Sequence, residues 1–232
     1  MTSELVYGRR AVREALRGRR EVLEVFATER AIRAEGWLSE RRVKACAERE
    51  LTELAGTRDH QGVVARAEPF RYADADELLA EDEPLLACLD QVTDPHNLGA
   101  VCRSAEGAGA TGVILPAHNS ARMTPAVSRA SAGAVEHLPI AVVSNLARWL
   151  AEAKGPRLWV YAADVGGTPM WEADLSGGLA LVFGAEGKGV RPLVRRTCDS
   201  AVSIPLAGTV DSLNVSVAAA VLLYEARRQR GV

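Results

Sequence analysis

The sequence of 232 residues predicts an α/β protein with a parallel sheet that is covered by helices on both faces. From Pro84 onward, short apolar runs alternate with segments of helical periodicity, which is the pattern of repeated βα units. Two of the runs, Leu179–Phe183 and Ala201–Leu206, break into glycine-containing turns that carry polar side chains. Such breaks form the ligand crevices of open α/β sheets. Residues 1–71 show a shorter α/β pattern and are expected to form a separate, smaller domain.

The amino-terminal domain is expected to alternate helices and strands. Gly18 follows the first helix and is placed to act as its C′ cap, and Gly62 marks a turn before the last strand. The predicted elements are a helix at Arg9–Arg17, a strand at Val22–Ala27, a charged helix at Ser39–Leu51 and a strand at Val63–Ala65. About 70 residues are near the lower size at which a core is stable alone.

Charge divides the chain into three segments. Residues 72–83 hold six acidic residues and no basic one, so they are expected to form a solvated linker helix between the domains. Residues 1–71 hold 15 Lys and Arg against 12 Asp and Glu, and residues 84–232 hold 13 against 12. The amino-terminal domain is therefore mildly basic, which permits contact with nucleic-acid phosphates although the whole chain has a net charge of −2.

The carboxyl-terminal domain, residues 84–232, is expected to contain the parallel sheet. The predicted strands are Leu85–Val92, Val113–Pro116, Pro139–Val143, Leu158–Ala163, Leu179–Phe183 and Ala201–Pro205. The predicted helices are Asn97–Ala108, Thr124–Ala134, Asn145–Lys154, Arg191–Thr197 and Val215–Glu225. The last helix is apolar nearly all round, so it is expected to be buried on every side, with one face on the sheet and another on a second subunit.

The first strand-to-helix turn, DQVTDPHN, contains candidates for an anion site. Asp94 and Pro95 start the turn, and Asn97 is placed either to cap the following helix or to act in a site. Arg103 lies six residues further on and is expected near the same face of the helix. A helix N-terminus with a nearby arginine binds anions, although an ordinary cap and a surface salt bridge use the same residues.

The turn GAEGKG, Gly184–Gly189, does not match a nucleotide-binding motif. Its spacing differs from the dinucleotide pattern G-x-G-x-x-G, and Gly189 stands where a P-loop needs Ser or Thr. Its glycines are expected to adopt positive φ or to let the backbone approach a flat ligand. Glu186 is the only acid of the turn and is either a site residue or a solvated carboxylate.

Ser212 and Asn214 lie just before the closing helix, and one of them is expected to be its N-cap. No G-x-S-x-G elbow precedes Ser212, and no histidine has a defined relation to it. A serine nucleophile therefore has little support.

The chain is expected to be cytoplasmic, reduced and free of metal. Its first residues lack the apolar segment of a signal peptide, and no stretch has the length of a membrane span. The four cysteines are scattered, without CxxC pairs or histidines at metal-ligand spacing.

Several segments resemble the SpoU (TrmH) family of RNA ribose 2′-O-methyltransferases, in the SPOUT superfamily. GAEGKGVR and IPLAGTVDSLNVSVAAAVLLYE are similar to its second and third motifs, and the spacing N-x-G-x-x-x-R of Asn97 and Arg103 is similar to its first. VYGRRAVREAL and HQGVVA resemble the amino-terminal substrate-binding module of the RlmB-like branch, which has a ribosomal-protein-like fold. The resemblance spans nearly the whole chain.

The resemblance implies a SPOUT methyltransferase domain with a C-terminal trefoil knot, preceded by a small substrate-binding domain. It implies a homodimer that transfers a methyl group from S-adenosylmethionine to a ribose 2′-hydroxyl of RNA. The most similar branch modifies a guanosine of large-subunit (23S) ribosomal RNA. The implied catalytic residues are Arg103, Asn97, Glu186, Ser212 and Asn214. The implied cofactor-binding residues are Gly184, Ile204, Leu206 and Leu213.

Other functions remain open at this point. Related branches modify transfer RNA or confer resistance to ribosome-directed antibiotics, and the HQG-bearing front module favours ribosomal RNA among these. A nucleotide- or NAD-linked α/β enzyme would need glycines that the first strand turn lacks. A non-catalytic RNA-binding module would not need Asn97, Arg103 and Glu186. Because a guanidinium with a pKa above about 12 is a poor base, Arg103 is expected to position a phosphate and to stabilise the developing alkoxide.

Overall fold

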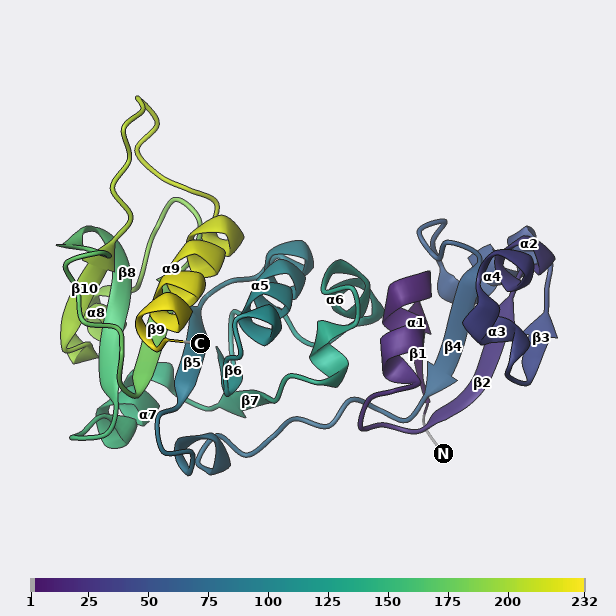
Figure 1. The fold of residues 1–232 in the computed structure, drawn as a ribbon, viewed down its shortest axis with the longest axis horizontal. Helices are drawn as coiled ribbons and strands as arrows, with labels where there is room; N and C mark the ends of the chain where they lie inside the picture. Colours follow the sequence, from purple (N-terminus) through teal and green to yellow (C-terminus); the bar gives the residue numbers. More distant parts are fainter. Residues whose placement is uncertain (1–2, 232) are drawn as a thin grey trace. The chain divides into compact units, whose positions relative to one another are not determined.

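The structure, a computed structural model, describes residues 3–231. The chain forms two compact units, and each has its own sheet (Figure 1). The first unit comprises Met1–Arg71 together with Arg122–His137, and the second comprises Tyr72–Ala121 together with Leu138–Val232. The predicted boundaries placed residues 122–137 in the carboxyl-terminal domain, so the structure differs from the prediction in this segment.

The second unit contains the parallel sheet that the apolar runs predict. Its strand order is β10-β8-β9-β5-β6-β7, and neighbouring strands pair in parallel. The strands are β5 (Leu85–Asp90), β6 (Gly112–Pro116), β7 (Ile140–Val143), β8 (Trp159–Pro169), β9 (Leu179–Gly184) and β10 (Ser200–Ser203). The predicted strands are therefore confirmed within the described chain, and β8 is longer than predicted. The trefoil knot remains a prediction.

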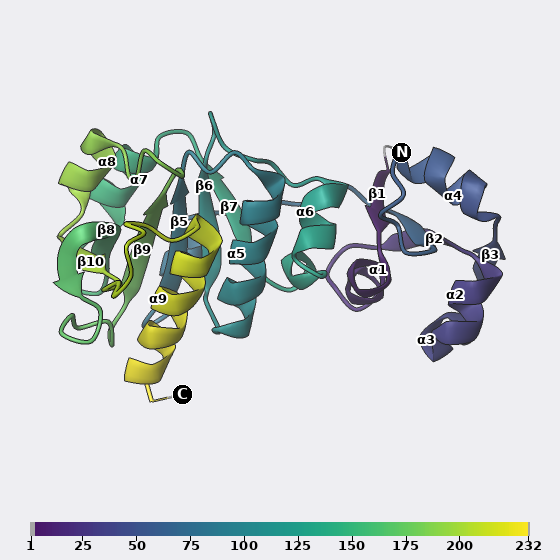
Figure 2. The same cartoon turned by 90° about the horizontal axis from the view of Figure 1, so that it is seen from above.

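Helices cover both faces of this sheet (Figure 2). α5 (Pro95–Gly107) and α9 (Val215–Gln229) pack against one another on one face, and α7 (Leu146–Ala153) and α8 (Pro192–Thr197) pack together on the other. Gly107 permits the close approach of α9, because a Cβ at Gly107 would lie 2.9 Å from the hydroxyl oxygen of Tyr224.

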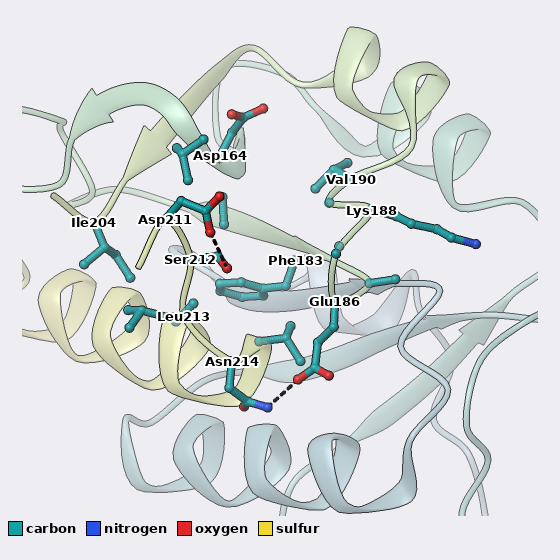
Figure 3. Close-up of a pocket in the computed structure, with 18 of the residues that line it drawn as sticks. Asp164, Phe183, Glu186, Lys188, Val190, Ile204, Asp211, Ser212, Leu213 and Asn214 are labelled. Atoms are coloured by element: carbon teal, nitrogen blue, oxygen red, sulfur yellow. Dashed lines mark hydrogen bonds between the residues drawn. The ribbon is translucent and has the colours of Figure 1, made fainter. Parts of the chain in front are cut away.

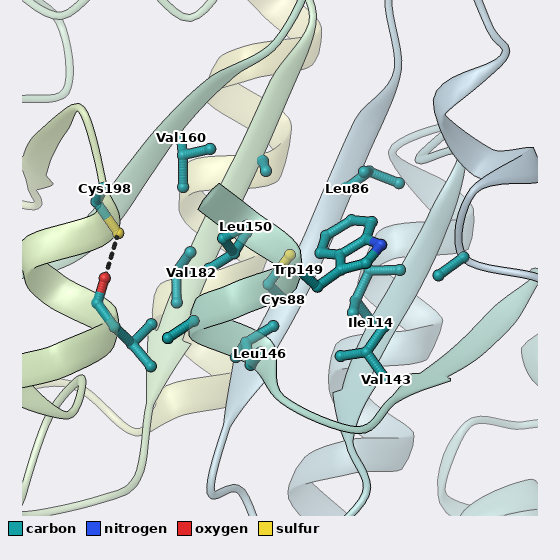
Figure 4. Packing of buried hydrophobic residues seen from close by; sticks show 14 of the residues in the cluster. Leu86, Cys88, Ile114, Val143, Leu146, Trp149, Leu150, Val160, Val182 and Cys198 are labelled. Atoms are coloured by element: carbon teal, nitrogen blue, oxygen red, sulfur yellow. Dashed lines mark hydrogen bonds between the residues drawn. The ribbon is translucent and has the colours of Figure 1, made fainter. Parts of the chain in front are cut away.

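A buried apolar cluster joins the sheet to α7 (Figure 4). Leu86, Val160 and Val182 come from three different strands and are fully buried against Trp149 and Leu150 of α7. Strands that are buried on both faces have no solvent side on which polar residues could alternate. They therefore appear in the sequence as continuous apolar runs, which is why the sequence predicts them.

The first unit contains a four-stranded sheet of order β1-β4-β2-β3. Its strands are β1 (Glu4–Tyr7), β2 (Val22–Ala27), β3 (Val43–Ala45) and β4 (Val63–Ala67). Its helices are α1 (Arg9–Ala15), α2 (Glu29–Ala34), α3 (Gly36–Ser39), α4 (Glu48–Ala55) and α6 (Pro125–Ala130), followed by a 3₁₀ turn, η2 (Ala134–Glu136). The predicted strand at Val22–Ala27 is confirmed, and Gly62 has a φ of 77° in the predicted turn.

The helix predicted at Ser39–Leu51 is wrong, because the segment forms β3 and the separate helix α4. Val43 pairs with Val25 in a parallel register, so the backbone of this edge strand bonds to β2. α4 begins after Ala47, whose backbone N–H donates to Glu50 Oε2 at 2.9 Å. The pairing partner of β3 is distant in the sequence, and local periodicity carries no information about it.

The sequence predicted Gly18 as the C′ cap of α1, and this prediction is wrong. The helix ends at Ala15, and Leu16 takes the cap position in a right-handed conformation. A Cβ at Gly18 would lie 2.7 Å from the Cβ of Glu136. The glycine therefore serves a close approach between two segments of the first unit rather than the end of a helix.

The acidic segment 72–83 was predicted to be a solvated linker helix, and this prediction is wrong. It forms only a short 3₁₀ turn, η1 (Glu77–Leu79), and its Ala75 and Leu78 are buried in the core of the second unit. The backbone N–H of Ala73 donates to Ile140 O at 2.8 Å, next to the edge of β7. The acidic side chains face solvent while the apolar ones between them complete the core, which composition alone does not distinguish.

The thiols of the second unit are expected to be unreactive in the folded protein. Burial raises the pKa of Cys102 to about 12 and that of Cys198 to about 11, and it also raises the pKa of Cys88. Since the thiolate is the reactive form, an aromatic disulfide reagent at about pH 8 should titrate at most one thiol before unfolding. That thiol is Cys46, which is half-buried, and all four should react in denaturant. Reaction of two or more thiols in the native state would contradict this burial.

Candidate functional site

The second unit has a pocket at the carboxyl ends of β9 and β10, beside β8 (Figure 3). Its volume of about 720 Å³ lies in the size range of small-molecule sites. The end of β9, the glycine turn that follows it and the segment between β10 and α9 form most of its wall. Of the residues that the sequence singles out, those in the wall are Gly184, Glu186, Ile204, Leu206, Ser212, Leu213 and Asn214.

The glycine turn has the backbone geometry that its sequence predicts. Gly187 and Gly189 have φ values of 72° and 64°, in the left-handed region that glycine favours. Gly184 has a different constraint, because a Cβ there would lie 1.9 Å from the carbonyl carbon of Gly189. The turn therefore folds back on the end of β9, with Gly189 N–H donating to Ala185 O at 2.9 Å.

An ion pair between a buried carboxylate and a partly exposed arginine fixes the far end of this turn. Asp90 is the last residue of β5, is fully buried and lies opposite Gly184 in the strand register. Its carboxylate accepts the backbone N–H of Arg191 at 2.8 Å and the Nε–H of Arg191 at 2.7 Å. Sequence reasoning missed Asp90, and the available signal was a single acid at the end of an otherwise apolar strand.

Asn97, Glu186 and Asn214 form a closed polar network at the rim of the pocket. Asn97 Nδ2 donates to Glu186 Oε1 at 3.1 Å, and Asn214 Nδ2 donates to Asn97 Oδ1 at 3.1 Å and also to Glu186 Oε1. These residues come from α5, the glycine turn and the start of α9, so the network joins three segments. The sequence predicts all three residues but not their contacts with one another.

The two possible cap roles are resolved by the structure. Asp94, rather than Asn97, is the N-cap of α5, because its Oδ1 accepts the backbone N–H of His96 at 2.8 Å. The sequence predicted that either Ser212 or Asn214 caps α9. The N-cap is Asn214, whose Oδ1 accepts the backbone N–H of Ser216 at 2.9 Å. The side chain of Asn97 therefore does not cap α5, and its hydrogen bonds are those of the polar network.

Arg103 makes no hydrogen bond to this network. Six residues of an α-helix turn by about 600°, so Arg103 points about 120° away from Asn97, and the prediction of a shared face is wrong. The side chain is exposed on α5 and does not line the pocket. Within residues 3–231 it makes no hydrogen bond or ion pair, which leaves its guanidinium open to an external anion.

The pocket combines apolar walls with acidic side chains. Phe183, Ile204 and Leu213 supply apolar surface, and Ser212 donates to Asp211 Oδ1 at 3.3 Å (Figure 3). The acids that line the pocket are Asp164, Glu186 and Asp211. Lys188 also lines the pocket, with the amino group of its side chain pointing outward (Figure 3), so the lining holds three acids against one base. A pocket with this charge favours a ligand that carries positive charge.

The family of the chain follows from its matches to known proteins. Residues 84–224 match the model of the SpoU rRNA Methylase family, and residues 5–73 match that of RNA 2′-O ribose methyltransferase substrate binding. The chain belongs to the SpoU rRNA methylase family.

Relatives with similar sequences carry related names. The 23S rRNA (guanosine-2′-O-)-methyltransferase RlmB of Ralstonia nicotianae is 52% identical over 186 residues, which cover 78% of this chain and 75% of the relative. The putative TrmH family tRNA/rRNA methyltransferase YacO of Bacillus subtilis is 36% identical and covers 98% of this chain and 96% of its own. The crystal structure of the SpoU methyltransferase AviRb from Streptomyces viridochromogenes, in complex with AdoMet, has a TM-score of 0.82 at 30% identity, covering 98% of this chain and 90% of that one.

Within residues 3–231, no group of three or more His, Cys, Asp or Glu side chains is arranged to hold a metal ion. None of the helices there is long and apolar enough to cross a membrane.

Proposed function

We propose that this SpoU-family protein transfers a methyl group from S-adenosylmethionine to the ribose 2′-hydroxyl of a guanosine in large-subunit ribosomal RNA. The observation that carries the proposal is the closed network of Asn97, Glu186 and Asn214 beside a pocket made by the glycine turn. Relatives named as 23S rRNA guanosine methyltransferases support the choice of substrate. The reaction would take place in the cytoplasm, where ribosomal RNA is modified.

The pocket fits S-adenosylmethionine in shape and in charge. The cofactor has a flat purine, which suits the apolar side chains of Ile204 and Leu213 and the bare backbone at Gly184. It also carries a positive sulfonium, which suits a pocket lined by Asp164, Glu186 and Asp211. Gly184, Ile204, Leu206 and Leu213 would hold the cofactor, as the sequence predicted.

The chain's own residues would align the reacting groups and steady charge. Bound S-adenosylmethionine would supply an activated methyl group to the ribose oxygen, with a neutral thioether as the leaving group. The network of Asn97, Glu186 and Asn214 would hold the glycine turn, and through it the cofactor, in a fixed position for this transfer. Arg103 would bind the phosphate next to the target ribose and stabilise the developing alkoxide. The proton of the hydroxyl would pass to water at the exposed rim beside Ser212.

Net charge supports the first unit as the principal RNA-binding part. Its two segments, 1–71 and 122–137, hold 17 Lys and Arg against 13 Asp and Glu, a net charge of +4. The second unit holds the other 11 basic and 17 acidic residues, a net charge of −6. Because RNA affinity depends on phosphate neutralisation, the acidic second unit needs a basic partner unit to retain the substrate.

Calorimetry tests the cofactor, with NAD as the competing ligand. We expect the protein to bind S-adenosylhomocysteine and not NAD, and the reverse result would favour a nucleotide-linked enzyme. Mapping of 2′-O-methyl nucleosides by mass spectrometry in 23S ribosomal RNA and transfer RNA, from cells with and without the gene, tests the RNA. Loss of one guanosine modification in 23S RNA is expected. Loss in transfer RNA, or at a site of antibiotic contact, would assign the chain to another branch.

We also propose that the protein acts as a homodimer through α9. The sequence predicted this helix to be buried on every side, but in the second unit Leu222 and Leu223 are buried while Val217 and Tyr224 are 47% and 50% exposed. Val217, the half-buried Val221 and Tyr224 are spaced four and three residues apart. They therefore form one apolar stripe along the helix. A second copy of the chain is the partner that would cover this stripe.

Replacing Val217 with aspartate should convert the dimer to a monomer. The substitution places a charge in the centre of an interface that would remove it from water, at a cost of several kcal/mol. Sedimentation at micromolar concentration measures the change, and Leu193→Asp is a matched control because Leu193 is 58% exposed on α8. If the unmodified protein sediments as a monomer, the homodimer proposal is wrong.

A further inference from the structure

Residues 122–137 belong structurally to the first unit although they lie inside the matched methyltransferase sequence. The family match runs through residues 84–224, and the segment lies between β6 and β7, which are neighbours in the sheet of the second unit. Its helix α6 nevertheless packs against β1 and α1, and η2 packs against α1. The chain therefore leaves the second unit after Ala121 and returns to it at Leu138.

A buried ion pair holds this segment in place. The side chain of Glu136 is 1% exposed, and its two carboxylate oxygens accept Arg20 Nε–H at 2.9 Å and Nη2–H at 2.6 Å. The Arg20 side chain is 7% exposed, and its remaining nitrogen donates to Glu4 Oε2 and to Glu68 O, both at 3.3 Å. A bidentate pair of this kind is strong and directional, and the loss of one partner leaves a buried charge uncompensated.

The surrounding contacts leave little freedom for the segment to move. A Cβ at Gly18 would lie 2.7 Å from the Cβ of Glu136, and a Cβ at Gly133 would lie 2.6 Å from the Cβ of Glu14. Glu14 also lies 3.0 Å from the Nε2 of His137, measured from its Oε2. The backbone of the segment is thus packed directly on α1.

The amino-terminal end of the segment continues into the site of the second unit. The backbone N–H of Ala121 donates to Val92 O at 2.9 Å. Val92 lies two residues before Asp94, the N-cap of the helix that carries Asn97 and Arg103. A force on residues 122–137 therefore acts, through one covalent step and one hydrogen bond, on the turn that starts α5.

From these contacts we infer that residues 122–137 couple RNA binding on the first unit to methyl transfer on the second, and that Arg20 and Glu136 are the positioning residues that fix the coupling. RNA bound to the first unit would act on this segment, which the chain and the hydrogen bond from Ala121 to Val92 connect to the turn before Asn97. The inference rests on the proposed function for its reaction, but the ion pair and its packing stand without it.

Glu136→Gln tests the inference because it keeps the shape of the side chain and removes its charge. We expect the affinities for RNA, by filter binding, and for S-adenosylhomocysteine, by calorimetry, to stay within about twofold. The rate of methyl transfer at saturating RNA and cofactor should fall about tenfold, which is within the usual range of coupling between sites. Trypsin should also cut after Arg129 faster than in the unmodified protein, because the segment is released.

Two further variants make the result interpretable. Arg20→Gln combined with Glu136→Gln replaces the ion pair by a neutral amide pair of similar shape, and it should recover most of the lost rate. Glu29→Gln removes an exposed ion pair with Arg33 in the same unit and should change neither rate nor cleavage. If Glu136→Gln only lowers the melting temperature and transfers methyl at the normal rate, the pair is merely structural and the inference is wrong. If the unmodified protein binds no S-adenosylhomocysteine, the proposed function fails. Faster cleavage after Arg129 in Glu136→Gln would still show that the ion pair with Arg20 holds residues 122–137 in place.

Discussion

Replacing Arg103 with alanine should lower methyl transfer to RNA about a hundred- to a thousandfold, the usual loss when one stabilising contact to a developing anion is removed. Arg103 is exposed, has no partner within residues 3–231 and does not line the pocket. The affinity for S-adenosylhomocysteine should therefore stay unchanged while the rate falls. Single-turnover methylation and calorimetry measure the two quantities separately. Arg157→Ala is the control, since Arg157 is another exposed arginine of the second unit.

The substitution Arg103→Lys separates two possible roles. Lysine keeps the positive charge but loses the planar fork that binds a phosphate through two hydrogen bonds, and it gives up a proton more readily. A phosphate clamp predicts a lysine variant nearly as slow as alanine, whereas a general base predicts appreciable activity that rises with pH. An Arg103→Ala variant that methylates RNA at the normal rate would reduce α5 to a structural helix.

The sheet of the second unit could be predicted because each strand carries its own signal. A strand covered on both faces is apolar throughout, as in Leu179–Phe183, and no knowledge of its neighbours is needed to recognise it. The short edge strand β3 and residues 122–137 gave no such signal. β3 forms because its backbone pairs with β2. Residues 122–137 are held in the first unit by the ion pair of Glu136 with Arg20, which lies more than 100 positions earlier.

The site was predictable where function places unusual residues in turns. Glycines at positive φ, a lone Glu186 and an Asn214 before a helix are visible in the sequence, and the resemblance to a known family assigned them roles. Their connection was not predictable, because it joins α5, the glycine turn and α9 across 117 positions. Asp90 was missed for the same reason, since its partner Arg191 lies 101 positions away. In the sequence alone, an aspartate at the end of an apolar strand is indistinguishable from one that begins a solvent-exposed turn.

Replacing Gly184 with alanine should weaken the binding of S-adenosylhomocysteine about ten- to a hundredfold. The new Cβ would lie 1.9 Å from the carbonyl carbon of Gly189 and 2.2 Å from Val190 N, so backbone and not a flexible side chain must move. Overpacking of this kind costs about 1–3 kcal/mol, and each 1.4 kcal/mol is a factor of ten in affinity. The turn would shift away from β9 and take Glu186 out of its hydrogen bonds with Asn97.

Gly208→Ala is the matched control for this effect. Gly208 lies in the segment between β10 and α9, has no positive φ, and a Cβ there would meet no atom within 4 Å. Calorimetry with S-adenosylhomocysteine should therefore give the unmodified affinity for Gly208→Ala and a weakened one for Gly184→Ala, while thermal unfolding shows that both proteins are folded. Equal affinities for the two variants would mean that the turn tolerates displacement from β9. The pocket would then not be the place where the cofactor contacts the chain's backbone.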